Sequence, residues 1–268
     1  MDLYAEEAGK GATVVLVHAG ICDSRMWDPQ WDAFPAAHRT VRYDLRGFGR
    51  SPLPPQPYSH GRDLVELLER LGIQQATLAG ASLGGRVALE VAVTHPEVVD
   101  ALILADAALP GFAWSDELRA FWAEEDAALE RGDLDTAVEV NLQMWVDGPR
   151  RPAAVADSAV RESVRRMQRR AFELQLPVWE DAEEELLVPD LARRLAAVRP
   201  PTLVVVGEED VSDFQQIATQ LAREIPGAQL AVIPNAAHLP SLERPAAFNE
   251  LVLRFLRGIA SGSGRLGR

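Results

Sequence analysis

The sequence predicts an α/β protein, with a doubly wound, mostly parallel sheet and an all-helical insertion. Short runs of β-branched and other apolar residues alternate with longer segments of helical periodicity, which is the order of elements in such a sheet. The short runs are apolar on both faces, as expected for parallel strands covered by helices on both sides. Between residues 110 and 189 this alternation stops, and only helical patterns remain.

The expected strands are Thr13–Val17, Thr40–Tyr43, Ala76–Ala79, Ala101–Ala105, Thr202–Val206 and Gln229–Ile233. Between them, Asp63–Leu71 carries leucines three and four residues apart, which is the apolar stripe of an amphipathic helix. Further helices are expected at Arg86–Val93, Ile217–Ile225 and Phe248–Leu256.

The segment 110–189 is expected to form helices at Glu117–Arg131, Asp133–Val146 and Ala153–Leu174, separated by Gly- and Pro-containing breakers. Tryptophans are concentrated in this segment, at Trp114, Trp122, Trp145 and Trp179. We therefore divide the chain into a core in two parts (1–109 and 190–258), a helical cap (110–189) and a flexible tail rich in Gly and Ser (259–268).

Composition narrows the class of protein. The chain has 268 residues, of which 47% are hydrophobic, and is long enough to bury a large core without disulfides. Its net charge of −13 argues against binding to nucleic acid or anionic membranes, because both need a basic surface. The single cysteine, Cys22, excludes an intramolecular disulfide and fits a reducing compartment. With no leader-like start and no apolar run of about 20 residues, we expect a cytoplasmic protein.

The strongest signal for chemistry is the G-x-S-x-G pentapeptide from Gly80 to Gly84, centred on Ser82. It lies directly between an expected strand and an expected helix, which is the position of a nucleophile on a tight strand-to-helix turn. Small residues are needed two positions before and after the serine because the turn leaves no room for side chains. We predict that Ser82 is a catalytic nucleophile.

A serine hydroxyl needs a base, and His238 is the histidine best placed to act as one. It follows the last expected strand, so it lies at the same edge of the sheet as Ser82. His38 and His60 are expected to be solvated. His95 is expected at a helix end, where a cation suits the helix dipole.

The base needs an orienting acid, and Asp210 is our choice because it lies three residues past the strand Thr202–Val206. Glu208, Glu209 and Asp213 in the same region are expected to be solvated. Asp106, directly past Ala101–Ala105, is the reserve acid.

A tetrahedral intermediate needs two backbone amides, and the first is expected from Leu83 at the helix start. The second is expected from Gly20, or next from Ile21, in the small-residue turn that follows the first strand. His18 at the start of that turn is expected to brace it by hydrogen bonds.

These motifs carry a family resemblance. The matching pieces are His18-Ala19-Gly20, the D-x-R-G-x-G-x-S pattern at 44–51, the pentapeptide around Ser82, Gly207-x-x-Asp210, and the segment 238–245. Across nearly the whole chain, the sequence resembles the α/β-hydrolase fold superfamily, whose chain order Ser…Asp…His it shares.

The resemblance implies that the helical segment walls the substrate pocket and that Arg46 lies in a structural loop without a catalytic role. Ala19 stands where the usual pattern has glycine. The sequence is similar to small bacterial esterases and enol-lactonases. Ser82 argues against haloalkane dehalogenases and epoxide hydrolases, which place an aspartate at this position.

We therefore expect a serine hydrolase that cleaves a small-molecule carboxylic ester or lactone through an acyl-enzyme, with no cofactor and no metal. Two alternatives stay open. One is a C–C bond hydrolase, or a cofactor-free haloperoxidase or dioxygenase, on the same triad. The other, less favoured, is a ligand-binding receptor with vestigial hydrolysis. The sequence leaves open the substrate and the oligomeric state.

Acidic residues gather in the expected cap, at 124–126 and 181–185. A solvated helix face explains them. If they face the pocket instead, they disfavour anionic substrates.

Overall fold

The computed structural model describes residues 3–151 and 157–262. Its centre is a seven-stranded sheet in the order β1-β3-β2-β4-β5-β6-β7. The strands are β1 (Ala5–Ala8), β2 (Thr13–Val17), β3 (Arg39–Tyr43), β4 (Ala76–Ala81), β5 (Val99–Ala105), β6 (Thr202–Gly207) and β7 (Gln229–Ile233). All neighbouring pairs are parallel except β1 with β3, so the predicted mostly parallel sheet is confirmed.

The strand β1 was not expected from the sequence, because its residues Ala-Glu-Glu-Ala contain no apolar run. It forms an antiparallel edge against β3, where Glu6 lies opposite Arg42. The Arg42 Nε lies 2.7 Å from a Glu6 carboxylate oxygen. Cross-strand charge pairs of this kind stabilise an exposed edge that hydrophobic periodicity does not reveal.

At the opposite edge of the sheet, the structure differs from a second expectation, which concerned the burial of β7. The strand β7 was expected to be buried on both faces, yet Leu230 is 44% exposed and Val232 is 54% exposed. Because side chains alternate along a strand, these two residues lie on one face, and that face of the edge strand is open to solvent.

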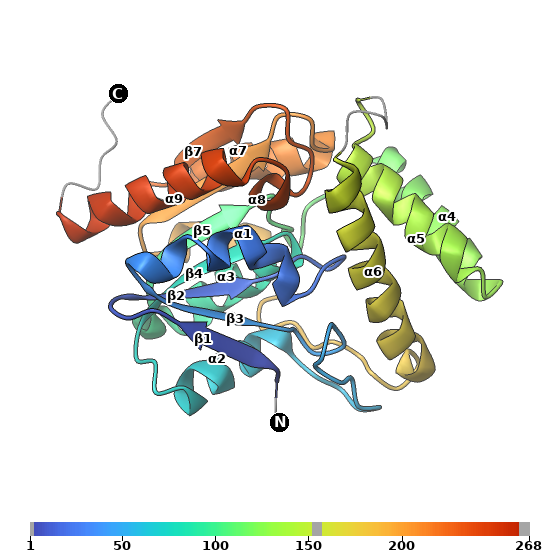
Figure 1. Cartoon of the computed structure of the whole chain (residues 1–268), viewed down its shortest axis with the longest axis horizontal. Helices are drawn as coiled ribbons and strands as arrows, with labels where there is room; N and C mark the ends of the chain where they lie inside the picture. Colours follow the sequence, from blue (N-terminus) through green and yellow to red (C-terminus); the bar gives the residue numbers. More distant parts are fainter. Residues whose placement is uncertain (1–2, 152–156, 263–268) are drawn as a thin grey trace.

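Helices lie on both faces of the sheet (Figure 1). They are α1 (Asp28–Trp31), α2 (His60–Arg70), α3 (Leu83–Thr94), α7 (Ser212–Glu224), α8 (Pro240–Glu243) and α9 (Pro245–Ala260). On one side α1 packs with α9, and on the other α2 packs with α3. The helix α9 continues past residue 258, where the core was expected to end. Residues 263–268 of the expected tail lie outside the described residues.

The segment between β5 and β6 contains three longer helices, α4 (Asp116–Glu130), α5 (Leu134–Leu142) and α6 (Ser158–Gln175). They lie together at one side of the sheet (Figure 1). Each helix is capped at its start by a side chain that accepts a backbone N–H of the first turn. The capping residues are Ser115, Asp133 and Asp157 respectively. Residues 153–156 of the third expected helix lie outside the described residues.

Between α5 and residue 148 the chain makes a short π-helical turn, Gln143–Asp147. Wide turns of this kind are rare and often occur at functional sites. Here the turn carries Trp145, whose contacts are described below. In the described parts of the chain, no helix is long and apolar enough to cross a membrane.

Candidate active site

Ser82 is the single residue between β4 and α3. Its backbone angles, φ +50° and ψ −112°, are strained for a residue with a side chain. A Cβ atom at Gly80 would collide with the Gly84 backbone, and one at Gly84 with the Val17 backbone. The close approach of three backbone segments explains why the pentapeptide requires glycine at these positions.

His238 and Asp210 meet at the carboxyl ends of the last two strands. The His238 Nδ1 lies 3.0 Å from Asp210 Oδ2 and 3.1 Å from Asp210 Oδ1. Both side chains are buried, with 2% and 1% of the residue surface exposed. Because Nδ1 faces the carboxylate, the other ring nitrogen, Nε2, is the one available to accept a proton.

Asp106 lies beside this pair at the end of β5, also with a positive φ of 44°. Its Oδ1 accepts the Gly207 N–H at 2.9 Å, whereas its buried Oδ2 has no hydrogen-bonding partner among the described residues. Burial and the nearby charge of Asp210 raise the pKa of Asp106 well above its usual value. Of these two carboxyl groups, Asp210 is the one that contacts His238.

Asp106, Asp210 and His238 place potential metal-ligating atoms within 4.8 Å of one another, and no other such group occurs in the described ranges. The His238–Asp210 contact already uses Nδ1 and both Asp210 oxygens. Three neighbouring acids, Glu208, Glu209 and Asp213, were expected to be solvated. Glu208 is exposed and Glu209 is half-buried. Asp213 is buried and accepts the Ser115 N–H at 2.7 Å, so it ties the start of α4 to α7.

His18 braces the turn after β2. Its Nε2 accepts the Leu45 N–H at 2.9 Å and its Nδ1 donates to the Ala19 carbonyl at 2.8 Å. Burial lowers the pKa of His18, which keeps the ring neutral for both bonds. The predicted bracing role is confirmed by these contacts.

The expectation that His60 is solvated was wrong. Its ring is buried next to Tyr58, at 5.0 Å between ring centroids, and burial lowers its pKa to about 3. Arg46 forms a buried ion pair with Asp63, with Nε at 2.8 Å from the carboxylate. Arg46 does not line the cavity described next.

Ser82, His238, Leu83, Gly20 and Ile21 all line one cavity of about 400 Å³. The structure thus brings together the predicted nucleophile, base and amide donors. Leu83 begins α3, so its amide is among those that have no acceptor inside the helix. A Cβ atom at Gly20 would lie 3.5 Å from the Leu83 side chain, which places the two loops in contact.

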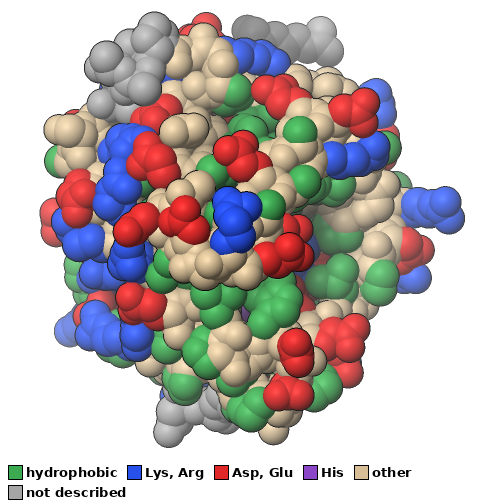
Figure 2. Space-filling model, turned by 90° about the vertical axis from the view of Figure 1, so that its right-hand side faces the viewer, with side chains coloured by type: hydrophobic (Ala, Val, Ile, Leu, Met, Phe, Trp, Pro, Cys, Tyr) green, Lys and Arg blue, Asp and Glu red, His purple; other side chains and the backbone are tan. Residues whose placement is uncertain are grey.

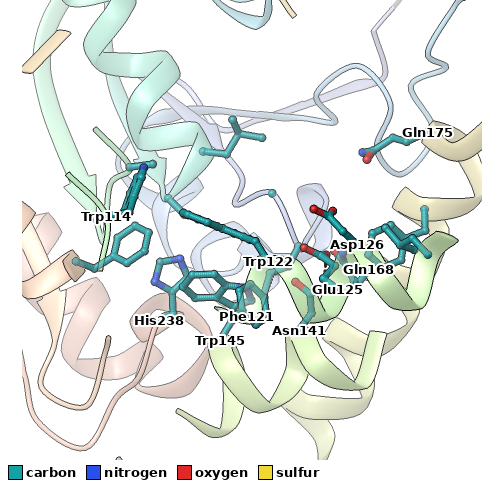
Figure 3. A pocket seen from close by; sticks show the side chains of 18 of the residues that line it. Trp114, Phe121, Trp122, Glu125, Asp126, Asn141, Trp145, Gln168, Gln175 and His238 are labelled. Atoms are coloured by element: carbon teal, nitrogen blue, oxygen red, sulfur yellow. Dashed lines mark hydrogen bonds between the residues drawn. The ribbon is translucent and has the colours of Figure 1, made fainter. Parts of the chain in front are cut away.

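The other side of the cavity is formed by the helical segment, and sequence reasoning did not assign these residues to the site. The Trp145 ring centroid lies 4.6 Å from that of His238, and Phe214 lies 4.4 Å away on α7. Polar side chains line the cavity farther from His238: Glu125, Asp126, Asn141, Gln168 and Gln175 (Figure 3). The expected solvated face thus holds for Glu124, whereas the half-buried Glu125 and the exposed Asp126 both line the cavity.

A buried ion pair connects the helical segment to the loop of His238. Glu243 accepts the Ala237 N–H at 3.0 Å and the Leu239 N–H at 3.3 Å, on either side of His238. Its other carboxylate oxygen pairs with Arg151. Arg151 also donates to the Val146 carbonyl at 2.6 Å, directly after Trp145. One contact network therefore positions both rings that face each other at the cavity.

Comparisons with known proteins show the family and the fold of this chain. The sequence model of the alpha/beta hydrolase family matches residues 14–251. A pimeloyl-(acyl-carrier protein) methyl ester esterase of Nitrosospira multiformis is 30% identical over 96% of this chain and 99% of its own. A putative carbamate hydrolase of Azorhizobium caulinodans is 31% identical, over 95% and 94%. The solved structure of a thermophilic esterase from Thermogutta terrifontis matches with a TM-score of 0.79 at 28% identity, over 96% and 93%.

The chain is similar to esterases and other hydrolases over nearly its whole length, and it carries a strand-to-helix serine turn on a mostly parallel sheet. These observations define a hydrolase. The chain belongs to the alpha/beta hydrolase family.

Proposed function

We propose that this hydrolase cleaves a small-molecule carboxylic ester or lactone through an acyl-enzyme on Ser82. The observation that carries the proposal is the buried contact between His238 Nδ1 and Asp210, which leaves Nε2 as the ring's proton acceptor in the cavity that Ser82 also lines. A base oriented in this way is what a serine hydroxyl needs to attack a carbonyl.

In the proposed mechanism, Ser82 Oγ attacks the carbonyl carbon while His238 Nε2 takes its proton. Asp210 holds the tautomer with the proton on Nδ1 and stabilises the imidazolium that forms. His238 then donates its proton to the leaving alcohol. A water molecule, deprotonated by the same nitrogen, attacks the acyl-enzyme and restores Ser82.

The negative oxygen of the tetrahedral intermediate is proposed to bind the Leu83 amide and a second amide from Gly20 or Ile21. All three residues line the cavity next to Ser82. Both candidates for the second amide stay open, because their backbone positions follow one another in the same turn.

We also propose that the segment 110–189 is a cap that encloses the substrate. Its helices supply much of the cavity wall, including Trp122, Trp145 and Phe172. In Figure 2, which faces this side of the molecule, hydrophobic side chains gather around a hollow and acidic side chains lie beside them. The expected cytoplasmic location stays a prediction.

Labelling of the full chain with a fluorophosphonate tests this proposal, since the reagent bonds covalently to an activated serine. We expect one labelled site that is lost in Ser82→Ala, together with turnover of p-nitrophenyl acyl esters. Absence of labelling, or equal labelling of Ser82→Ala, would reject Ser82 as the nucleophile. Turnover of vinylogous diketones but not of esters would favour the C–C hydrolase, and tight ligand binding with a single slow turnover would favour the receptor.

A further inference from the structure

The end of the cavity remote from His238 carries a polar cluster, defined here as Glu125, Asp126, Asn141 and Gln168. Figure 3 shows these side chains grouped together, with the rings of Trp122 and Trp145 lying between them and His238. The cavity therefore has a reactive end, an aromatic middle and a polar end. The cluster has no part in the mechanism proposed above.

The hydrogen bonds of the cluster leave it rich in acceptors. Asn141 Nδ2 donates to Glu125 Oε1 at 2.6 Å and to the Ala137 carbonyl at 2.9 Å, so both of its N–H groups are used. What remains of Asn141 is its carbonyl oxygen, and Glu125 keeps a second carboxylate oxygen.

Gln168 gives an independent indication of a missing donor. The residue is 4% exposed and lines the cavity, and its Oε1 is buried without a hydrogen-bonding partner in the described parts of the chain. A buried carbonyl oxygen without a donor is costly, so a ligand that supplies an N–H group there gains affinity.

The charged side chains at this end of the cavity are all acidic. Glu125 and Asp126 line the cavity, and no lysine or arginine of residues 3–151 and 157–262 does so. Burial raises the pKa of Glu125, and the neighbouring Asp126 adds to this. A cation at this end would meet the half-buried Glu125 and the exposed Asp126, with no basic side chain of the described residues in the cavity lining, whereas a carboxylate would meet repulsion there.

We propose that this polar cluster binds an ammonium group of the substrate and excludes a carboxylate at the same place. The inference rests on the proposed function, because it names the class of ester: an acyl chain with its carbonyl at Ser82, methylenes along the aromatic rings, and an ammonium group at the cluster. Aromatic faces also attract a cation that lies against them.

Three p-nitrophenyl esters with the same five-methylene chain test the proposal. They are the esters of 6-aminohexanoic acid, of heptanoic acid, and of heptanedioic acid with its far carboxylate free. We expect kcat/KM for the ammonium ester to exceed that for the carboxylate ester by about tenfold or more, the value of a charge-assisted hydrogen bond. The heptanoate ester measures the contribution of the chain alone.

Glu125→Gln is expected to reduce the ratio between the ammonium and carboxylate esters, and Gln168→Met to reduce it less. The matched control is Glu124→Gln, an exposed residue of the same helix outside the cavity. A carboxylate ester hydrolysed as well as the ammonium ester would overturn the proposal. So would an equal loss of preference in Glu124→Gln and Glu125→Gln, since a general surface charge would then explain it.

A binding measurement separates this inference from the proposed function. Several tryptophans line the cavity, so their fluorescence reports on occupancy. If no ester is hydrolysed, the proposed function fails, and tighter binding of hexylammonium than of hexanoate, weakened in Glu125→Gln, still supports the cluster. Equal binding of the two ions would overturn the inference whatever the activity.

Discussion

The carboxyl edge of the sheet and the helical segment meet at one cavity, yet they are built differently. The sheet edge supplies Ser82, Asp106 and Asp210 from turns directly after strands, two of them with positive φ. The helical segment supplies side chains such as Glu125, Trp145 and Gln168 from helices and one π-helical turn. Rigid strand ends suit reacting groups that need fixed geometry, whereas a helical layer can vary its side chains and so vary the substrate.

The largest expected effect comes from a substitution at the carboxyl edge of the sheet. Asp210→Asn should lower kcat for a p-nitrophenyl ester by about 10⁴-fold, because a neutral amide no longer stabilises the His238 imidazolium or its tautomer. Asp106→Asn should stay within about tenfold, because an amide oxygen still accepts the Gly207 N–H and Asp106 makes no hydrogen bond to His238. Steady-state kinetics decide between them. If Asp106→Asn is the more damaging change, the assignment of the acid is wrong.

The next largest effect is expected from removing the ion pair that connects the helical segment to the His238 loop. Arg151→Ala leaves Glu243 buried without its partner, and the side chains of both are at most 7% exposed. We expect a loss of about 3–5 kcal/mol in the free energy of unfolding, measured by urea denaturation, together with lower kcat. Arg119→Ala, which removes an exposed ion pair with Asp116, is the control and should change neither quantity measurably. An equally small change in Arg151→Ala would show that the buried pair does not brace the His238 loop.

A third effect concerns the core alone. His60 has a pKa of about 3 in the folded protein, below the 6.5 of a free histidine. Between these values the unfolded chain binds a proton that the folded protein does not, so stability falls as pH falls from about 6.5 toward 3. Urea unfolding at pH 7 and pH 5 should show about 2 kcal/mol of this loss from His60.

One variant isolates this contribution. His60→Asn should remove it from the pH dependence of the free energy of unfolding. An unchanged pH dependence in His60→Asn would contradict the prediction.

The smallest expected effect tests how the helical segment contributes to catalysis. The Trp145 ring faces His238 at 4.6 Å, so it can stabilise the imidazolium that forms in the transition state. Trp145→Leu should lower kcat for a small neutral ester by about tenfold, with less change in Trp145→Phe. Trp179→Leu, at a 61% exposed position of the same cavity, should change kcat less. Equal effects at both positions would indicate loss of pocket shape instead of a contact with His238.

The sequence predicted most accurately those elements whose local residue pattern directly reflects their local structure. Continuous apolar runs mark the strands, so β2 and β7 were located to the residue, although one face of β7 is open to solvent. The turn at Ser82 requires glycine at two positions, so it could be recognised in the sequence by its G-x-S-x-G pattern. The strand β1 was not predicted from the sequence. Its contacts with β3 include charged pairs, and these do not produce a periodic hydrophobic pattern.

By itself, the sequence determined the chain order of the longer helices and of every strand except β1, the serine turn, and which acid and histidine follow neighbouring strands. Only the tertiary structure decided that His238 contacts Asp210 and not Asp106, and that Glu125, Asn141 and Gln168 converge at one end of the cavity. The physical reason is that strand ends are brought together by the sheet's fixed spacing, whereas side chains on separate helices meet only through packing angles that no local pattern encodes.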